Sequence, residues 1–317
     1  DVATSTDRQF WYRTPAQYDG QVLSWSFEAT SDVIWFAYFA PYSQEQHADL
    51  VAAAANADGV SYKNLGLSPQ GRSIDYLKVS ALPVSSVDQQ TPRQRKQLWL
   101  IARQHPGESM AEWWMEGCLE RLLDTDDASS RALRGLADIH VVPNMNPDGS
   151  FLGNLRTNAL GVNLNREWDS PSLDKSPEVF YVKERMQQTG IDFAIDVHGD
   201  EALPYNFIAG PEGIPSWNDQ RDAELIALKR TWATLNPDFQ VEHGYPRTPA
   251  GKADLSICSS QLAQCFDCLA VTLEMPFKDT LDTPCPFAGW SAERSIRLGA
   301  SFVDVARMAL LGRLLSD

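Results

Sequence analysis

The chain has 317 residues, of which 43% are hydrophobic, and its formal net charge is −15. A chain of this length builds one large domain or two modest ones, and it has enough apolar residues to bury a full core. The negative charge argues against nucleic acid and anionic membranes as partners, because both attract basic surfaces. The sequence has no apolar stretch of the length that spans a bilayer, so we expect no membrane partner.

Residues 1–42 have the composition of β-strands. The segments 21–29 and 32–40 are rich in aromatic and β-branched residues, and Pro41 follows the second one. Two strands of this kind are marginally stable by themselves in water. We therefore expect residues 1–42 to be the C-terminal part of an N-terminal β domain that packs on the residues after it.

Strands and helices alternate over residues 43–317, which we expect to form a second domain. Strands are expected at 72–80, 96–104, 138–144, 193–197, 205–209 and 269–275. Helices are expected at 44–57, 108–123, 175–189, 218–236 and 290–315. Near-continuous apolar strands indicate a sheet covered on both faces, and the alternation indicates an α/β architecture. We predict a mixed, mostly parallel central sheet with helices on both faces, preceded by the end of a small β-sandwich domain. The polar segment 81–97 is predicted to be an exposed loop.

Two of the predicted strands lead directly into a histidine. His105 follows the strand in WLIARQHPGE at 99–108, and His198 follows the strand in DFAIDVHG at 192–199. Glu108 comes three residues after His105, across a Pro-Gly turn. Catalytic zinc binds two histidines and one carboxylate and leaves a fourth position for water, and catalytic groups of open α/β sheets lie past the carboxyl ends of strands. The sequence therefore predicts a site for one zinc ion at His105, Glu108 and His198.

These three residues also have a purely structural interpretation. Glu108 would then stabilise only the dipole of the helix that follows it, and His198 would be a buried, hydrogen-bonded imidazole. The spacing alone does not decide between the two interpretations, because His198 and Glu201 form a second His-x-x-Glu pair.

Glu274 is the candidate for a general base. It ends the apolar run CLAVTLEMPF, where Pro276 stops the strand. A carboxylate at such a position is costly unless it faces a cleft or a partner, and a hydrolase with a metal ion also needs a base. The alternative is a glutamate in a surface ion pair at the end of a strand.

The segment 143–168 is a long loop that is dense in Asn, Gly and Arg. Ordered loops of this length are usually functional. Its Arg156 and Arg166 can each bind a carboxylate through two parallel hydrogen bonds, which lysine cannot do. The alternative is that both arginines only hold the loop in place.

The five cysteines indicate a reducing compartment. Their number is odd and the chain is long, so a secreted disulfide framework is not expected. Cys265 and Cys268 form one Cys-x-x-Cys pair, which is half of a structural zinc site, and no second pair follows at a suitable spacing. With no secretion signal in the sequence, we expect reduced thiols and a cytoplasmic location.

Six short motifs of this chain resemble those of the zinc carboxypeptidases and occur in the same order. They are HPGE, NPDG, GNLR, GVNLNREW, DVHG and TLEMPF. The resemblance covers about residues 60–300 and is strongest to the cytosolic carboxypeptidase branch, which carries a β-sandwich before the catalytic domain. The stretch 10–42, with its ending FAYFAPYS, resembles the last strands of that β domain.

The resemblance implies a role for each residue of the site. His105, Glu108 and His198 would bind zinc, and Arg156 in GNLR would polarise the scissile carbonyl. Asn165 and Arg166 in NLNR would bind the C-terminal carboxylate of the substrate, and Glu274 would be the general base and then the proton donor. The implied activity is hydrolysis of the C-terminal peptide bond of peptides or protein tails by a catalytic domain at residues 43–317.

Two departures from the family pattern concern the surroundings of the metal and of the substrate. Position 163 is Asn, where many relatives have an Asp that orients a zinc-binding histidine, so Asp196 is a candidate for another acceptor. The tyrosine that relatives place over the substrate is not marked by a motif here, and Tyr245 is our candidate.

The sequence does not decide which C-terminal amino acid the enzyme would remove. Deglutamylating relatives bind an acidic side chain in a basic pocket, but here Asp254 lies near the place of their arginine. Lys252 or Arg247 would have to substitute for it if the enzyme removes C-terminal glutamate.

Two other classes of function remain as alternatives. One is a zinc amidohydrolase that acts on small N-acylated amino acids, and the other is a non-catalytic module that binds C-terminal tails. The NLNR and TLEM motifs favour the peptidase over the amidohydrolase. The complete set of metal ligands and the base argue against a non-catalytic module. The oligomeric state is not indicated by the sequence.

Overall fold

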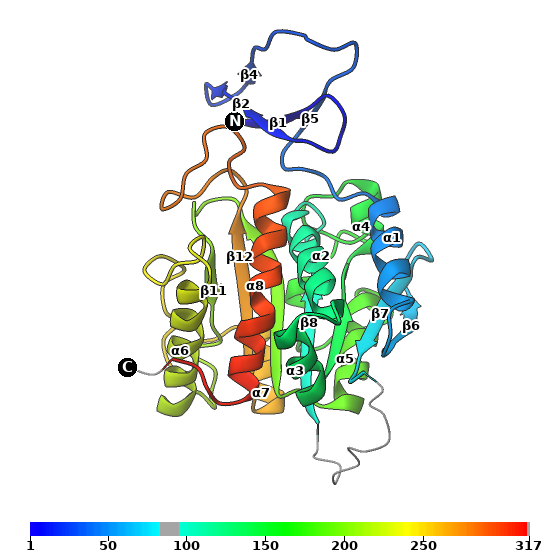
Figure 1. Ribbon diagram of the computed structural model, residues 1–317, viewed down its shortest axis with the longest axis vertical. Coiled ribbons are helices and arrows are strands. Elements are labelled where there is room, and N and C mark those ends of the chain that lie inside the picture. The colour runs from blue at the N-terminus through cyan, green and yellow to red at the C-terminus, as the bar shows by residue number, and fades with distance from the viewer. Residues whose placement is uncertain (83–94, 316–317) are drawn as a thin grey trace.

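The computed structural model describes residues 1–82 and 95–315 of the chain (Figure 1). Most of the segment 81–97, predicted to be an exposed loop, lies outside the described residues. None of the described helices is both long enough and apolar enough to cross a membrane.

A seven-stranded sheet forms the centre of the molecule. Its strands are β6 (Val60–Leu67), β7 (Ser73–Val79), β8 (Lys96–Ala102), β9 (Ala137–Val142), β10 (Phe193–Asp200), β11 (Phe207–Ala209) and β12 (Leu269–Pro276). Their order across the sheet is β11-β12-β10-β8-β9-β7-β6. The four central strands β12, β10, β8 and β9 are parallel neighbours, whereas β11 and β7 run against their neighbours. The predicted mixed sheet with a parallel centre is therefore confirmed.

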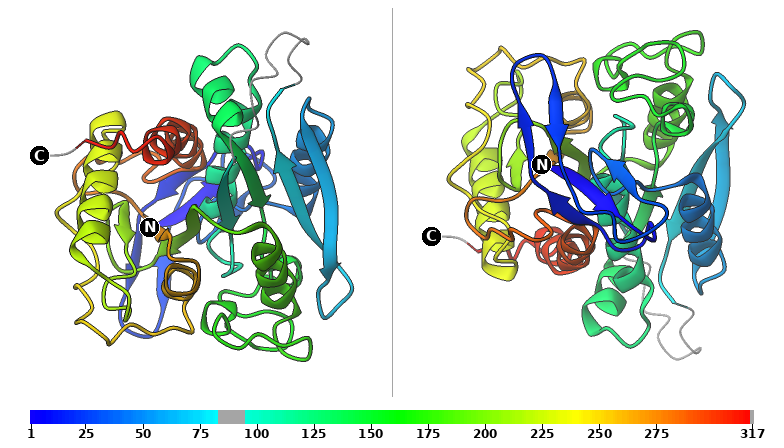
Figure 2. Two further views of the ribbon diagram at one scale, coloured as in Figure 1. Left: turned by 90° about the horizontal axis from the view of Figure 1, so that it is seen from below. Right: turned by 90° about the horizontal axis from the view of Figure 1, so that it is seen from above.

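Helices cover both faces of this sheet, as predicted (Figure 2). The described helices are α1 (Gln44–Ala55), α2 (Met110–Leu123), α3 (Ala128–Leu136), α4 (Pro147–Leu152), α5 (Pro177–Thr189), α6 (Asp219–Leu235), α7 (Cys258–Phe266) and α8 (Ala292–Leu310). The long pair α2 and α8 packs on one face, and α5 and α7 pack on the other. Strand β8 shows why, because its side chains alternate between two apolar cores: Leu98 and Leu100 lie in the first, Trp99 and Ile101 in the second.

The N-terminal residues form a small antiparallel unit rather than two long strands. Its strands are β1 (Val2–Ser5), β2 (Tyr12–Thr14), β3 (Ala16–Tyr18), β4 (Leu23–Trp25) and β5 (Trp35–Ala37). They pair as a sheet of order β2-β1-β5 and a separate β3-β4 pair. The expected strands at 21–29 and 32–40 are thus reduced to three residues each, and most of their aromatic side chains are exposed. This unit lies over the end of the central sheet where β8, β10 and β12 terminate (Figure 1).

Five described elements after residue 42 were not predicted: β6, α3, α4, α7 and a 3-10 helix, η1 (Leu164–Arg166). Strand β6 is an edge strand with mostly exposed or half-buried residues, so it lacks the apolar run that marks the inner strands. The helices α3, α4 and α7 have only six to nine residues, which is too short for a clear helical period in the sequence.

Candidate metal centre and active site

The turn that carries His105 and Glu108 begins where β8 ends. Arg103 has a positive φ of 59° and turns the chain away from the sheet direction. Gly107 then donates its N–H to the carbonyl of Leu155 at 2.9 Å, and a Cβ at this position would lie only 2.7 Å from the Leu155 side chain. Glu108 follows, two residues before α2 begins, so it precedes the first helical turn in which we expected it.

His198 lies inside β10 rather than after it, because this strand continues to Asp200. The neighbouring strand β8 stops earlier, and its pairing with β10 ends at Val197 and Ala102. Beyond this point the backbone N–H of Gly199 has no strand partner on the β8 side. It donates instead to Oε2 of Glu108 at 3.0 Å. The end of β8 therefore leaves the space in which the three predicted metal ligands meet.

The side chains of His105, Glu108 and His198 converge and are all buried. The Nδ1 atoms of the two histidines are 3.1 Å apart. Glu108 places Oε1 2.7 Å from Nδ1 of His105 and Oε2 2.8 Å from Nδ1 of His198. Within residues 1–82 and 95–315, these three form the one cluster of His, Cys, Asp and Glu donors with the spacing of a metal site.

The outer nitrogen of each histidine bonds an oxygen, which orients the inner nitrogen. Nε2 of His105 lies 2.9 Å from Oδ1 of Asn163, and Nε2 of His198 lies 2.9 Å from Oδ2 of Asp196. An oxygen at this distance makes Nε2 the protonated nitrogen and leaves the Nδ1 lone pair facing the centre. Asn163 therefore orients His105 itself, and Asp196 serves the other histidine rather than replacing Asn163.

A polar chain that the sequence analysis missed supports Asp196 from behind. Gln104 donates from Nε2 to Oδ2 of Asp196 at 2.6 Å, and Trp168 donates from Nε1 to Oε1 of Gln104 at 2.8 Å. The only signal in the sequence was position, since Gln104 precedes His105 and Trp168 ends the GVNLNREW motif. All three side chains are buried, so the hydrogen bonds fix the carboxylate that holds His198.

The charges around this centre favour a cation within it. Burial alone would lower the pKa of His198, but Asp196 and Glu108 outweigh it and raise this pKa well above its ordinary value. Burial likewise opposes ionisation of Glu108, yet His198 and His105 lower the pKa of this carboxyl to about 2. The cluster thus holds an ionised carboxylate against two histidines whose Nδ1 atoms converge. A cation that displaced the proton between them would find the donor set of a catalytic zinc site.

The geometry fits zinc. Two nitrogens bound about 2.0–2.1 Å from a tetrahedral ion lie about 3.3 Å from each other, compared with 3.1 Å between the two Nδ1 atoms here. His105, Glu108 and His198 would hold the ion and leave one position open toward the cavity. These distances support the predicted ligand set.

Glu274 is the immediate neighbour of this centre. It pairs with His198 in the parallel register of β12 and β10, and it is buried. Burial raises the pKa of its carboxyl well above the usual range, and the nearby carboxylates of Glu108 and Asp200 add to this. Its Oε2 atom is buried without a hydrogen-bond partner among the described residues. The surface ion pair that we considered for Glu274 is absent from the described structure.

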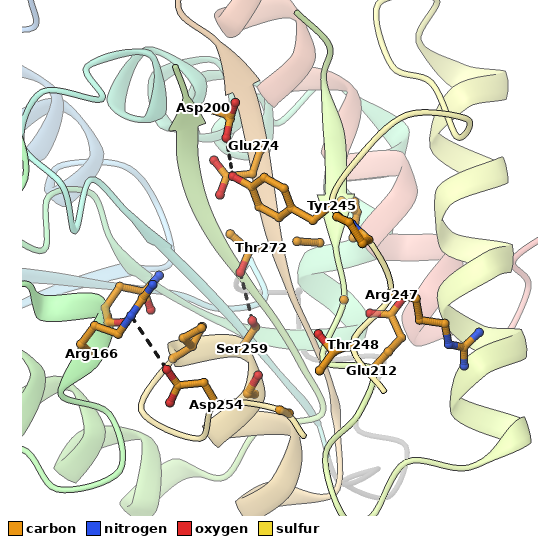
Figure 3. Close-up of a pocket in the computed structure, with 18 of the residues that line it drawn as sticks. Arg166, Asp200, Glu212, Tyr245, Arg247, Thr248, Asp254, Ser259, Thr272 and Glu274 are labelled. Carbon is orange, nitrogen blue, oxygen red and sulfur yellow. Dashed lines mark hydrogen bonds and ion pairs between the residues drawn. The ribbon is translucent and has the colours of Figure 1, made fainter. Parts of the chain in front are cut away.

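A cavity of about 440 Å³ opens beside the metal ligands and Glu274 (Figure 3). The predicted Arg156, Asn165, Arg166 and Tyr245 all line it. Asn165 accepts the N–H of Cys258 on Oδ1 at 2.8 Å, and its Nδ2 lies 3.5 Å from Nε2 of His198. The hydroxyl of Tyr245 donates to Oδ2 of Asp200.

The cavity contains side chains of both signs, and several are already paired. Nε of Arg166 forms an ion pair with Oδ2 of Asp254 at 3.9 Å. Nη2 of Arg247 forms an ion pair with Oδ1 of Asp222 on α6 at 2.6 Å. Figure 3 shows the Arg247 guanidinium directed away from Thr272 and Ser259. Lys229, Lys252 and Glu212 also line the cavity, and no ion pair to any of the three is seen in the described part of the chain.

Comparison with known families agrees with this geometry. Residues 46–219, more than half of the chain, match the family described as zinc carboxypeptidase. Residues 1–39 match the family described as the cytosolic carboxypeptidase N-terminal domain. The expected resemblance to both is confirmed.

Individual relatives give the same picture. An uncharacterized protein of Zymomonas mobilis is 48% identical over 93% of this chain and 74% of its own length. Cytosolic carboxypeptidase 6 of Caenorhabditis elegans is 28% identical over 84% of this chain, which spans 59% of that protein.

Solved structures resemble the whole chain. A metallo-carboxypeptidase from Burkholderia cenocepacia is 41% identical with a TM-score of 0.90, over 98% of this chain and 81% of that one. A metallo-carboxypeptidase from Pseudomonas aeruginosa, in complex with (2-guanidinoethylmercapto)succinic acid, is 43% identical with a TM-score of 0.91, over 99% and 81%. The chain belongs to the zinc carboxypeptidase family, whose members are metallocarboxypeptidase enzymes.

Proposed function

We propose that this protein is a zinc-dependent carboxypeptidase that hydrolyses the C-terminal peptide bond of peptides or protein tails, with one zinc ion per active site. The observation that carries the proposal is the pairing of Glu274 with His198. This register places a buried carboxylate with a free oxygen beside the converging donors of His105, Glu108 and His198. A metal site and a base at one cavity are the two parts that metal-assisted hydrolysis needs.

When bound, zinc would lower the pKa of a water molecule and polarise the scissile carbonyl. Glu274 would accept a proton from the attacking water at Oε2, the atom that has no partner in the described structure. A cation bound beside Glu274 would oppose the burial that raises the pKa of its carboxyl, so that the carboxylate can accept this proton and then pass it to the leaving amine.

The remaining predicted residues would bind and orient the substrate. Arg156 would stabilise the negative charge that develops on the carbonyl oxygen. Nδ2 of Asn165 and the guanidinium of Arg166 would bind the C-terminal carboxylate. Tyr245, held by Asp200 in the cavity wall, would lie over the terminal residue.

The cations available to bind a C-terminal glutamate differ from those that we first considered. Arg247 is paired with Asp222, so we propose Lys252 and Lys229 as the groups that would bind an acidic side chain. Glu212 in the same cavity would instead favour a basic side chain. The ligand of the Pseudomonas relative has both carboxylates and a guanidinium, and such a ligand matches the mixed charges of this cavity.

We further propose that residues 1–42 and 43–317 are separate domains, the second being catalytic. The cytoplasmic location stays a prediction, which the existence of cytosolic relatives supports. For the five thiols, which are all free in the structure, we expect the reduced state.

A panel of C-terminal dipeptide substrates tests the proposed function. Zinc-loaded protein is expected to release the terminal amino acid, chelation is expected to abolish release, and added zinc is expected to restore it. The panel includes Glu, Asp, Lys, Phe and Ala at the C-terminus, together with an N-acylated amino acid. Cleavage of the acylated amino acid alone would support the amidohydrolase instead. Binding of tails by fully zinc-loaded protein without cleavage would support the non-catalytic module.

A further inference from the structure

The chain that leaves the catalytic strand β12 runs as a long loop from 277 to 290, which we name the 277–290 loop. It begins three residues after Glu274 and leads to α8. Two arginines from different parts of the molecule bond its backbone carbonyls. Arg294 of α8 donates to the carbonyls of Gly289 at 3.2 Å and Thr283 at 2.9 Å. The second arginine, Arg13, comes from β2 of the N-terminal unit.

Arg13 forms hydrogen bonds with backbone carbonyls at both ends of the 277–290 loop. Its Nη2 donates to the carbonyl of Phe277 at 2.7 Å and to that of Trp290 at 3.0 Å. Its Nε donates to the carbonyl of Ala288 at 3.3 Å, and its backbone N–H donates to the carbonyl of Phe287 at 2.8 Å. One side chain therefore bridges the first and the last residue of the loop, and a planar fork of donors suits this task.

The packing around this guanidinium leaves little freedom. Burial lowers the pKa of Arg13 to about 10, so it stays charged near neutral pH. Gly289 has a φ of 64°, and a Cβ at this position would lie 3.0 Å from Nε of Arg13 and 2.3 Å from the carbonyl oxygen of Lys278. The glycine thus allows the close approach of the loop to the arginine.

The N-terminal unit also contacts the other half of the active site. The ring of Tyr38 packs on that of Phe277 with centroids 4.5 Å apart. Two residues on, the carbonyl of Ala40 accepts hydrogen bonds from Oγ of Ser109 at 2.8 Å and Nε1 of Trp113 at 3.1 Å. Ser109 directly follows the metal ligand Glu108. The segment 38–42 therefore joins the exit of the base strand to the turn that carries the metal ligands.

We propose that Arg13 is a positioning residue for catalysis: by bonding both ends of the 277–290 loop, the N-terminal unit fixes where β12 leaves the sheet and so fixes Glu274 relative to the metal ligands. This inference rests on the proposed function, because it takes Glu274 as the base. It gives the N-terminal unit a role in the rate of the reaction and not only in solubility or folding. A small displacement of a catalytic group is enough to slow an enzyme strongly.

The test compares zinc-loaded wild type with Arg13→Ala, Arg13→Lys and the control Arg8→Ala. Arg8 lies in the same unit, is exposed, and has its guanidinium over the Trp35 ring of that unit. For Arg13→Ala we expect kcat to fall about 10-fold or more, with KM within about 2-fold and zinc content unchanged. Low concentrations of guanidinium ion should restore part of kcat by occupying the vacated place. Hydrogen exchange in peptides covering 277–290 should become faster, and Arg8→Ala should behave as wild type.

The outcomes separate this proposal from the proposed function. A wild type without zinc-dependent peptidase activity refutes both. An active wild type with unchanged kcat in Arg13→Ala refutes only the role of Arg13. The role is also refuted if the loss of activity merely equals the loss of folded, zinc-bound protein. Should Arg13→Ala not fold, Arg13→Lys decides, because lysine keeps the charge but lacks the planar fork that reaches the carbonyls of Phe277, Ala288 and Trp290 together. A lowered kcat in folded protein supports the proposal, and a wild-type kcat overturns it.

Discussion

Glu274 lies directly beside His198 in the pairing of two neighbouring parallel strands. Side chains at paired positions of parallel strands project from the same face of the sheet. Strand register therefore brings the candidate base to His198, whereas His105 and Glu108 reach the centre from the turn that follows β8. A slip of one residue in this register would move Glu274 to the opposite face of the sheet. The buried apolar residues of β12, which fix the register, therefore also fix the position of Glu274.

Replacing Glu274 by Gln should remove turnover and keep the metal. We expect kcat to fall about 10²–10⁴-fold, the usual contribution of a general acid–base group, while zinc content stays near one ion per chain. Steady-state kinetics and metal analysis on the same sample provide the measurement. Glu201→Gln, which changes an exposed carboxylate of the same cavity, is the matched control. Retained turnover in Glu274→Gln would exclude it as the base.

Substitutions at Asn163 should change zinc affinity in opposite directions. Asn163→Ala removes the oxygen that lies 2.9 Å from Nε2 of His105, and loss of such a contact typically weakens metal binding about 10–100-fold. Asn163→Asp replaces the amide with a charged acceptor, which makes the histidine a stronger ligand, so it should tighten binding. Competition with a chromogenic chelator measures both dissociation constants. Equal constants in all three proteins would contradict this role, and Asn64→Ala on the edge strand β6 serves as the control.

Substitutions of the two cavity arginines should change different kinetic constants. Arg166→Met should raise KM with little change in kcat, because binding of the C-terminal carboxylate is the same in the ground state and the transition state. Arg156→Met should lower kcat about 10²–10³-fold, as expected for a donor to the developing oxyanion. A substrate with an amidated C-terminus is the control, since Arg166→Met should not weaken its binding further. A lowered kcat in Arg166→Met and a raised KM in Arg156→Met would instead assign oxyanion stabilisation to Arg166 and carboxylate binding to Arg156.

Protonation of His47 should make stability depend on pH. His47 of α1 contacts Glu112 and lies 3.0 Å from Asp75. Burial alone would lower its pKa, but these two carboxylates outweigh burial and raise the pKa to about 9 from the ordinary 6.5. Between these values the folded state binds more protons than the unfolded state. The added stability is therefore fully present below pH 6.5 and is lost as pH rises through about 9.

The size of this effect is on the order of 3 kcal/mol in the free energy of unfolding. Urea unfolding of wild type and His47→Gln at several pH values between 6 and 10 measures it, and the difference between the two curves isolates His47 from other groups that titrate in this range. His243→Gln, which changes an exposed histidine, should leave the wild-type dependence intact. A constant difference between wild type and His47→Gln across this range would disprove the linkage.

The central strands could be predicted from the sequence because each is a run of consecutive apolar residues, and the candidate metal ligands because they lie at or just after the ends of such runs. Strands β8, β10 and β12 are apolar runs, and His105, Glu108, His198 and Glu274 lie at their carboxyl ends. The spatial convergence follows from the parallel order of these strands. The catalytic and binding roles stay predictions until the variants above are measured.

Contacts between distant polar residues could not be predicted in the same way. Gln104 and Asp196 are 92 positions apart, and neither has a periodicity that marks it. The same holds for Arg13 and the carbonyl of Phe277, which are separated by 264 positions. The short N-terminal strands were overestimated because their aromatic composition fits a strand, whereas the structure leaves many of these rings exposed.

Glu108 also completes the hydrogen bonding of the central sheet. Strand β8 ends before its neighbour, and the carboxylate accepts the N–H of Gly199 at 3.0 Å in the place where a further residue of β8 would have paired. A buried N–H without an acceptor costs about 1–3 kcal/mol. Removal of this carboxylate therefore damages the fold and the ligand set together, so selection for stability alone would retain it. In a descendant of this protein that had lost catalysis, we would expect Glu274 to vary before Glu108 does.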